Sequence, residues 1–295
     1  MDTMDRTGRL PVDKTYKLFI KNEFVRSESG RSLAVANETT GGVTNVSRAS
    51  RKDTREAVIA AKAGWAGETA YLRGQILYRL AEVMEGRRAE LADARAAAGV
   101  STDEAREEVD LAIDRVVHYA GWTDKFGMLL SSTNPVAGPH FNVTSPEPTG
   151  VVGVVPPDGG ATLLTMVSTV LPVIASGNGV IVVAPERDPR TTIVWCECIA
   201  TSDMPAGVVN VLTGLRSELV PQLAKHMDIQ ALDVWMSSTV DAALAKQAAV
   251  DGADNVKRVK VRDSQSVDWA SDEAQGLSFI EPWVEQKTVW HPVGL

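Results

Sequence analysis

The chain has 295 residues, 44 % of them hydrophobic, which is enough to bury a substantial core in one large domain or two small ones. Its formal net charge of −8 at pH 7 argues against a nucleic-acid-binding protein, because neutralising phosphates requires a basic surface. The two cysteines, Cys196 and Cys198, would point roughly 200° apart on a helix, so we expect neither a metal site nor a disulfide framework. This cysteine usage and the absence of a leader-like start predict a reduced, cytoplasmic protein.

The first third of the chain is predicted to contain a hairpin and three helices. Residues 1–16 are polar and are expected to be frayed. Apolar and polar residues alternate on both sides of the turn Ser27–Gly30, which predicts a hairpin there. Amphipathic patterns predict helices at residues 52–66, 70–97 and 102–127.

The third of these helices has a recognisable start and a recognisable buried face. Ser101 can cap the helix and Glu104 can reach back to the cap, which is a capping box. A stripe of apolar residues is expected to face the core, namely Val109, Ile113, Val116 and Val117.

From Gly150 onward, short apolar runs alternate with helical patterns. Strands are predicted at residues 150–155, 179–184, 207–213, 229–235 and 256–261, with helices near 161–176, 190–202, 216–226 and 239–251. Strands that are apolar on both faces and alternate with helices predict an α/β fold, a Rossmann-like parallel sheet covered by helices on both faces. Such sheets bind ligands at the carboxyl ends of their strands.

One uncharged stretch, residues 159–185, is long enough to resemble a membrane span. Pro172 lies inside it, and residues 176–179 form a tight turn before a β-branched run. We therefore expect a buried helix followed by a buried strand, and no membrane association.

Three motifs in the second half carry a family resemblance. They are PTGVVGVVPPDGG at 148–160, VLPVIASGNGVIVVAPERDP at 170–189 and MPAGVVNVLTG at 204–214. With them the sequence resembles the aldehyde dehydrogenase superfamily, in register from about residue 17 to 262, and residues 104–122 and 276–290 resemble that family's third helix and final strand. The resemblance implies an NAD-binding-type domain at 17–130 and 148–265 and short oligomerisation strands at 131–147 and 270–295. It also implies that the catalytic domain is absent, because the chain passes to the final strand between about residues 269 and 276.

The resemblance assigns the cofactor positions residue by residue. The family's ribose-binding lysine and glutamate correspond to Val183 and Glu186, so that only the glutamate is kept. The turn that closes on the pyrophosphate has Met236 in place of a glycine, and Asp241 adds a negative charge there. Glu186, Ser237 and Ser238 are therefore the residual cofactor-binding candidates, and we expect no cofactor, with NAD or NADP as the weaker alternative.

The catalytic positions are altered as well. The oxyanion-binding asparagine of the family corresponds to Gly159, which has no side-chain donor, and its general-base glutamate corresponds to Arg262, which stays protonated. Cys196 and Cys198 match packing residues on a helix and are expected to be structural. We therefore expect no catalytic residues and no intrinsic activity.

These observations predict an aldehyde-dehydrogenase-like, non-catalytic subunit that assembles by strand pairing with a full-length active dehydrogenase, or with itself, as a structural or regulatory partner. One alternative is a module that binds or senses NAD(P), and another is a subunit that contributes to aldehyde oxidation only within a hetero-oligomeric complex. The expected interface residues are Phe141, Val143, Trp283, Val284, Val289 and Trp290, with Trp283, Val284, Val289 and Trp290 exposed on the final strand.

Overall fold

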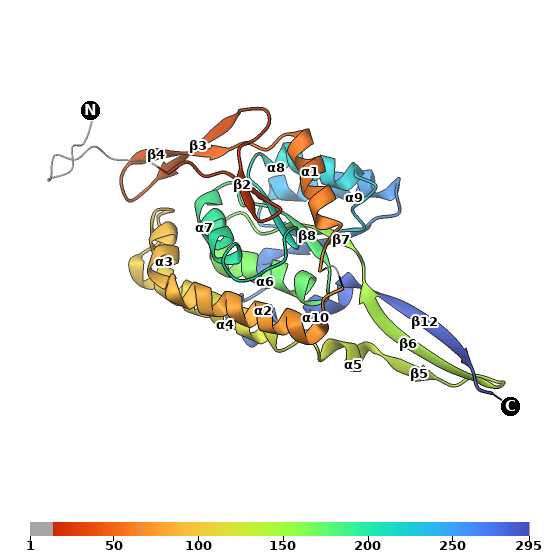
Figure 1. Ribbon diagram of the computed structural model, residues 1–295. Helices are drawn as coiled ribbons and strands as arrows, with labels where there is room; N and C mark the ends of the chain where they lie inside the picture. The colour runs from red at the N-terminus through yellow and green to blue at the C-terminus, as the bar shows by residue number, and fades with distance from the viewer. Residues whose placement is uncertain (1–13, 66, 295) are drawn as a thin grey trace.

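The computed structural model describes residues 14–65 and 67–294, and its centre is a seven-stranded sheet in the order β11-β10-β7-β8-β9-β1-β2 (Figure 1). Five neighbouring strands are parallel: β11 (Arg258–Asp263), β10 (Ala231–Met236), β7 (Val151–Val155), β8 (Gly179–Val183) and β9 (Val209–Leu212). β1 (Leu18–Ile20) and β2 (Glu23–Val25) add two antiparallel strands at one edge. The Rossmann-like sheet predicted from the sequence is confirmed.

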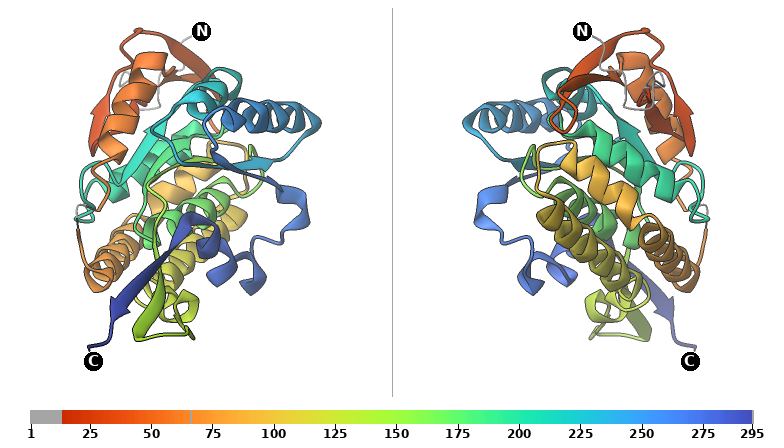
Figure 2. Two further views of the ribbon diagram at one scale, coloured as in Figure 1. Left: turned by 90° about the vertical axis from the view of Figure 1, so that its right-hand side faces the viewer. Right: turned by 90° about the vertical axis from the view of Figure 1, so that its left-hand side faces the viewer.

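Helices cover both faces of this sheet (Figures 1 and 2). One face carries α1 (Arg51–Ala61), α8 (Arg216–Lys225) and α9 (Thr239–Ala253). The other carries α6 (Thr162–Ala175) and α7 (Pro189–Ile199), with α2 (Ala70–Gly86), α3 (Arg88–Ala96) and α4 (Thr102–Ala120) packed outside them. Because both faces are covered, every residue of β7 and β8 is buried, which explains their continuous apolar sequences.

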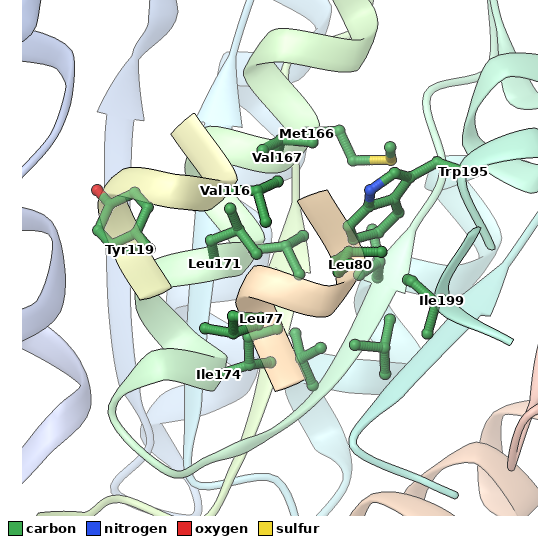
Figure 3. Packing of buried hydrophobic residues seen from close by; sticks show 14 of the residues in the cluster. Leu77, Leu80, Val116, Tyr119, Met166, Val167, Leu171, Ile174, Trp195 and Ile199 are labelled. Atoms are coloured by element: carbon green, nitrogen blue, oxygen red, sulfur yellow. The ribbon is translucent and has the colours of Figure 1, made fainter. Parts of the chain in front are cut away.

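The larger part of the core lies between α6 and the helices outside it. Side chains from α2, α4, α6 and α7 interdigitate there, including Leu77, Leu80, Val116, Tyr119, Met166, Leu171 and Trp195 (Figure 3). All fourteen residues of α6 are buried, so the uncharged stretch is the predicted buried helix and strand. No helix within the described ranges is long and apolar enough to cross a membrane.

The predicted hairpin around Ser27–Gly30 is wrong. Two other hairpins form, β1 with β2 and β3 (Ser32–Asn37) with β4 (Gly42–Ser47). The first turns at Lys21 and Asn22, which both have positive φ angles of 55° and 59°, as a tight two-residue hairpin requires. The predicted turn is instead held against the start of α1, where the Ser27 hydroxyl donates to the Asp53 carboxylate at 2.7 Å.

The first helices are shorter than their patterns predict. The 70–97 segment breaks at Arg87, whose φ and ψ of −114° and 18° are not helical, and the 102–127 segment ends at Ala120 before a short helix, α5 (Phe126–Leu130). The capping box of Ser101 and Glu104 is confirmed. Val117 was wrongly assigned to the buried stripe, because the helix turns its side chain outward and leaves it 41 % exposed. The segment predicted to be frayed lies outside the described residues except for 14–16, of which Tyr16 bridges to Val46.

A three-stranded antiparallel sheet, called the arm below, extends from the body with the end of the chain at its tip (Figure 1). It consists of β12 (Val284–Pro292), β6 (His140–Pro148) and β5 (Ser132–Asn134), with β6 in the middle. β12 pairs with β6 along its whole length, from Val284 opposite Pro148 to Pro292 opposite His140. One edge of β12 therefore has no partner strand within the described part of the chain.

Residues 264–283 connect the main sheet to the arm. This segment forms two 3₁₀ turns, Ser264–Ser266 and Asp272–Ala274, followed by α10 (Leu277–Ile280) and a third turn, Glu281–Trp283. The buried Arg115 of α4 fixes it by donating to the carbonyl oxygens of Trp269 at 2.9 Å and of Ala274. The segment thus packs onto the body through these backbone contacts and through the buried side chains of Phe279, Ile280 and Trp283.

Candidate functional site at the carboxyl edge of the sheet

The loops that follow β7, β8 and β10 meet at the carboxyl edge of the parallel sheet. The Asp158 N–H donates to the Ser237 hydroxyl at 3.1 Å, which joins the loop after β7 to the loop after β10. The Arg187 N–H donates to the Asp158 carboxylate at 3.0 Å, which joins the loop after β8 to the same point. This edge is where an α/β sheet of this kind binds its ligand.

At the start of α9, the Asp241 carboxylate accepts hydrogen bonds from Ser237 and Ser238. One of its oxygens accepts from the Ser237 N–H at 3.0 Å, the Ser237 hydroxyl at 2.8 Å and the Ser238 hydroxyl at 3.0 Å. Ser238 also caps the helix by accepting from the Asp241 N–H at 3.3 Å. Burial opposes ionisation of Asp241, but the Ser237 hydrogen bonds and the Arg216 charge outweigh it and hold the pKa of this carboxyl below its ordinary value.

Arg216, the first residue of α8, faces the second oxygen of this carboxylate. Its Nη1 lies 3.5 Å from the Asp241 Oδ1, and its Nη2 donates to the Trp235 carbonyl at 3.3 Å. The side chain is 4 % exposed, yet its Nε has no hydrogen-bond acceptor among the described residues. The sequence analysis missed Arg216, although a charged residue two positions after the glycine that ends the β9 motif was a signal that could have found it.

The three residual cofactor candidates come together at this edge. Glu186 accepts a hydrogen bond from the Arg216 N–H at 2.5 Å, and Arg216 pairs with Asp241, which holds Ser237 and Ser238. Each candidate side chain is therefore already engaged within the chain. Asp241 carries a full charge where the donors converge, so these residues do not fit the pyrophosphate of a dinucleotide as they stand.

The general-base position is occupied by a cation stacked on aromatic rings. The Arg262 Nε lies 3.1 Å from a carboxylate oxygen of Asp233 on the neighbouring strand, and its guanidinium lies over the Trp235 ring at 5.1 Å from the centroid. Phe279 and Trp283 also face it, at 5.7 Å and 5.6 Å. Burial raises the pKa of Asp233 to about 6, with the Arg262 charge opposing the rise. Arg262 thus joins β11 to the 264–283 segment.

The start of α6, next to the loop that contains Gly159, is capped by a side chain from another helix. Glu108 of α4 accepts from the Leu163 N–H at 2.6 Å, and Arg95 of α3 pairs with it at 2.7 Å. The same guanidinium pairs with Asp188 at 2.5 Å and donates to the Gly160 carbonyl at 2.7 Å. Burial outweighs these partners and raises the pKa of Glu108. No local sequence pattern points to this network, because its members are far apart along the chain.

The two thiols lie on α7 and are fully buried. Burial raises the pKa of Cys196 well above its ordinary value and that of Cys198 to about 12, so neither forms a thiolate at neutral pH. The prediction that both are structural residues is consistent with this burial. Within the described ranges, no group of three or more His, Cys, Asp or Glu side chains could hold a metal ion.

The expected interface residues divide into two groups. Phe141, Val289 and Trp290 are 52 %, 50 % and 58 % exposed on the arm, and the partly buried Val143 lies opposite Val289. Trp283 and Val284 are 1 % and 6 % exposed, so the expectation that they are exposed is wrong. They precede the free part of β12 and pack into the main core, where Trp283 also meets Arg262.

The sheet order and the joined loops at its carboxyl edge define a Rossmann-like domain of the dinucleotide-binding type. The chain belongs to the aldehyde dehydrogenase family, whose model matches residues 24–262. Among solved structures, it is similar to an aldehyde dehydrogenase from Bacillus cereus determined as its NAD+ complex, with a TM-score of 0.78 and 27 % identity. The match covers 85 % of this chain and 51 % of that one. HpcC from Thermus thermophilus gives a TM-score of 0.76 and 26 % identity, covering 84 % of this chain and 48 % of that one.

Among curated proteins, the chain is 33 % identical over 265 residues to mouse cytosolic 10-formyltetrahydrofolate dehydrogenase, covering 86 % of this chain and 29 % of that protein. It is 34 % identical over 262 residues to mouse retinal dehydrogenase 2, covering 86 % of this chain and 49 % of the relative. The chain thus spans half the length or less of these relatives.

These comparisons overturn the expectation of a chain without enzymatic activity. The family model over residues 24–262 and the two curated relatives described above are named for dehydrogenases, so altered single side chains are not sufficient grounds for expecting no activity. The expectation rested on altered single positions, such as Gly159 and Arg262, and on the catalytic domain that the resemblance implied to be absent.

Proposed function

We propose that the chain is an oxidoreductase subunit that takes part in aldehyde oxidation within a complex, where it pairs through its arm with a full-length aldehyde dehydrogenase. The observation that carries the proposal is the edge of β12 that no strand of the described residues covers, and residues 285–292 of this strand are all exposed. A long unpaired strand with exposed apolar side chains invites aggregation unless another strand covers it. Strand addition by a second sheet satisfies its backbone groups and buries Val289 and Trp290.

The chemistry of the described residues supports a complex over an isolated subunit. Aldehyde oxidation in this family uses a thiolate nucleophile, and neither Cys196 nor Cys198 can form one in its buried position. In the complex, the partner subunit would contribute a thiolate and a cofactor site of its own. This chain would supply the arm and the cofactor-domain scaffold, and we place the complex in the cytosol, as the name of the 10-formyltetrahydrofolate relatives indicates for them.

Co-expression with a full-length aldehyde dehydrogenase tests the proposal. We expect the two chains to elute together, with a mass that fits a mixed oligomer, and aldehyde-dependent NADH formation by the complex to differ from that of the partner alone. Trp290→Lys should disrupt the complex, whereas Met227→Lys, at a side chain that is 82 % exposed outside the arm, should leave it intact. A chain that stays separate from its partner and changes no NADH formation would refute the proposal.

A second candidate function is NAD(P) binding or sensing by the chain itself. The parallel sheet and the NAD+ complex of a structural neighbour favour it, and Glu186, Ser237 and Ser238 lie at the appropriate edge. The Asp241 carboxylate opposes it. Calorimetry with NAD+, NADP+ and adenosine phosphates separates the outcomes, because the absence of heat at millimolar ligand would eliminate this function.

A further inference from the structure

Several donors converge at the start of α9 in the manner of an anion-binding site. The Ser237 N–H, the Ser237 and Ser238 hydroxyls and the Arg216 guanidinium all point to one place, which we call the anion site. The positive end of the helix dipole adds to their attraction for a negative charge. The chain's own Asp241 carboxylate occupies this place.

Ordinary helix capping explains only part of this arrangement. Ser238 and Asp241 are three residues apart, and a serine cap with an acidic residue at the third helical position is common. Capping does not require a guanidinium, yet Arg216 approaches from a different helix and is 4 % exposed. Its Nε also lacks an acceptor in the described part of the chain, which is costly for a buried charged group.

A carboxylate also matches this set of donors incompletely. Its two oxygens receive three hydrogen bonds on one side and a 3.5 Å approach from Arg216 on the other. A tetrahedral phosphate presents more acceptor oxygens in more directions and could receive the remaining guanidinium donor as well. The donors gathered here therefore exceed what one carboxylate accepts, and a phosphate group offers more acceptors for them.

We propose that Asp241 is an internal occupant of a phosphate-type anion site and determines its specificity, so that removing the carboxylate opens the site to inorganic phosphate and to the phosphates of nucleotides. Because it concerns the carboxyl edge of the sheet, where NAD(P) binding is proposed above, this proposal rests on the proposed function. It nevertheless concerns residues of this chain alone, and it is tested on the purified chain without partner, aldehyde or turnover.

The test measures phosphate binding by calorimetry for the wild-type chain and for Asp241→Ala and Asp241→Asn. We expect both variants to bind inorganic phosphate at least tenfold more tightly than the wild type. Their affinity for NAD+ should increase by a similar factor. Adding Arg216→Gln to Asp241→Ala should abolish the gain, because the guanidinium is the charged member of the site.

Asp251→Ala is the matched control. Asp251 lies on the same helix, is 8 % exposed and pairs with Lys225, so its removal changes the net charge and the burial in the same way, away from the anion site. An equal gain in this control, or phosphate binding by the wild type as tight as by the variants, would overturn the proposal. If Asp241→Ala and Asp241→Asn do not fold, phosphate should restore their melting temperature selectively, and a failure of this rescue would count against the proposal as well.

Discussion

Replacing Arg262 with methionine tests whether the cation at the general-base position now holds the structure together. The substitution keeps an unbranched side chain beside Trp235, Phe279 and Trp283 but removes the partner that lies 3.1 Å from the Asp233 carboxylate. Asp233 would retain the Trp235 Nε1 donor at 2.9 Å and nothing else of comparable strength. Breaking one side of a buried ion pair costs about 3–5 kcal/mol, and the lower end applies because the Arg262 side chain is 21 % exposed.

The same pair gives the destabilisation a pH dependence with a definite sign. Burial raises the pKa of Asp233 from an ordinary 3.8 to about 6, so the folded state binds the proton more tightly than the unfolded chain. The contribution of Asp233 to the free energy of unfolding is fully present at pH values below 3.8, its ordinary pKa, and is lost as the pH rises through about 6, its pKa in the folded state. At neutral pH the loss amounts to about 3 kcal/mol relative to low pH. Without Arg262, the folded pKa rises further, and the loss at neutral pH grows.

Urea denaturation followed by tryptophan fluorescence at pH 5 and pH 8 measures both effects. Arg262→Met should lose about 3 kcal/mol at pH 8, equivalent to roughly 6–12 °C in melting temperature, and clearly less at pH 5. The double variant with Asp233→Asn should recover most of the loss, because no buried charge remains. A loss below about 1 kcal/mol, or an equal loss at both pH values, would refute this account of the pair.

Three further predictions concern the scaffold around the site. Arg95→Met should lower the free energy of unfolding by about 3–5 kcal/mol, because it leaves two buried carboxylates, those of Glu108 and Asp188, without their shared cation. Thermal unfolding measures the loss, with the surface substitution Arg106→Met as the control. Cys196 and Cys198 should not react with a thiol reagent in the native chain and should both react in denaturant; fast native labelling would contradict their burial. Gly179→Ala should cost at least about 3 kcal/mol or prevent folding, since the added Cβ would lie 2.2 Å from the Ala61 carbonyl oxygen, whereas Gly86→Ala, which meets nothing, should be tolerated in the same unfolding assay.

The parts of the fold that were predictable are those determined by local periodicity. The strands β7 and β8 follow from continuous apolar runs, because both of their faces are buried. The edge strand β11, RVKVRD, is partly exposed and follows from an alternation of valines with charged residues. The predicted hairpin was placed at the wrong turn because apolar and polar residues alternate equally well on both sides of several turns in this region. Only the positive φ angles at Lys21 and Asn22 select the true one.

The site was less predictable, because its charges are matched across elements. Glu108 caps α6 from α4, and Arg216 reaches Asp241 from the preceding helix, so neither role has a signature in the surrounding sequence. Position-by-position comparison singled out Asp241 and Arg262 as departures from the family pattern. It could not show that Arg262 has an Asp233 partner or that Asp241 meets both Ser237 and Arg216, since these contacts depend on neighbours that folding brings together.

The pairing of β6 with β12 also determines when the arm can form. Thr144 and Thr288 share a hydrogen bond at 2.9 Å although 144 residues separate them, and almost the whole main sheet is synthesised between them. At 5–20 residues per second, the ribosome needs roughly 7–30 s to deliver the second strand after the first. During that interval β6 cannot yet pair with β12, while the Rossmann-like domain folds. Newly made chains therefore cannot present the complete arm until β12 has been synthesised, so recruitment into an oligomer would select for chains whose central domain has already been made.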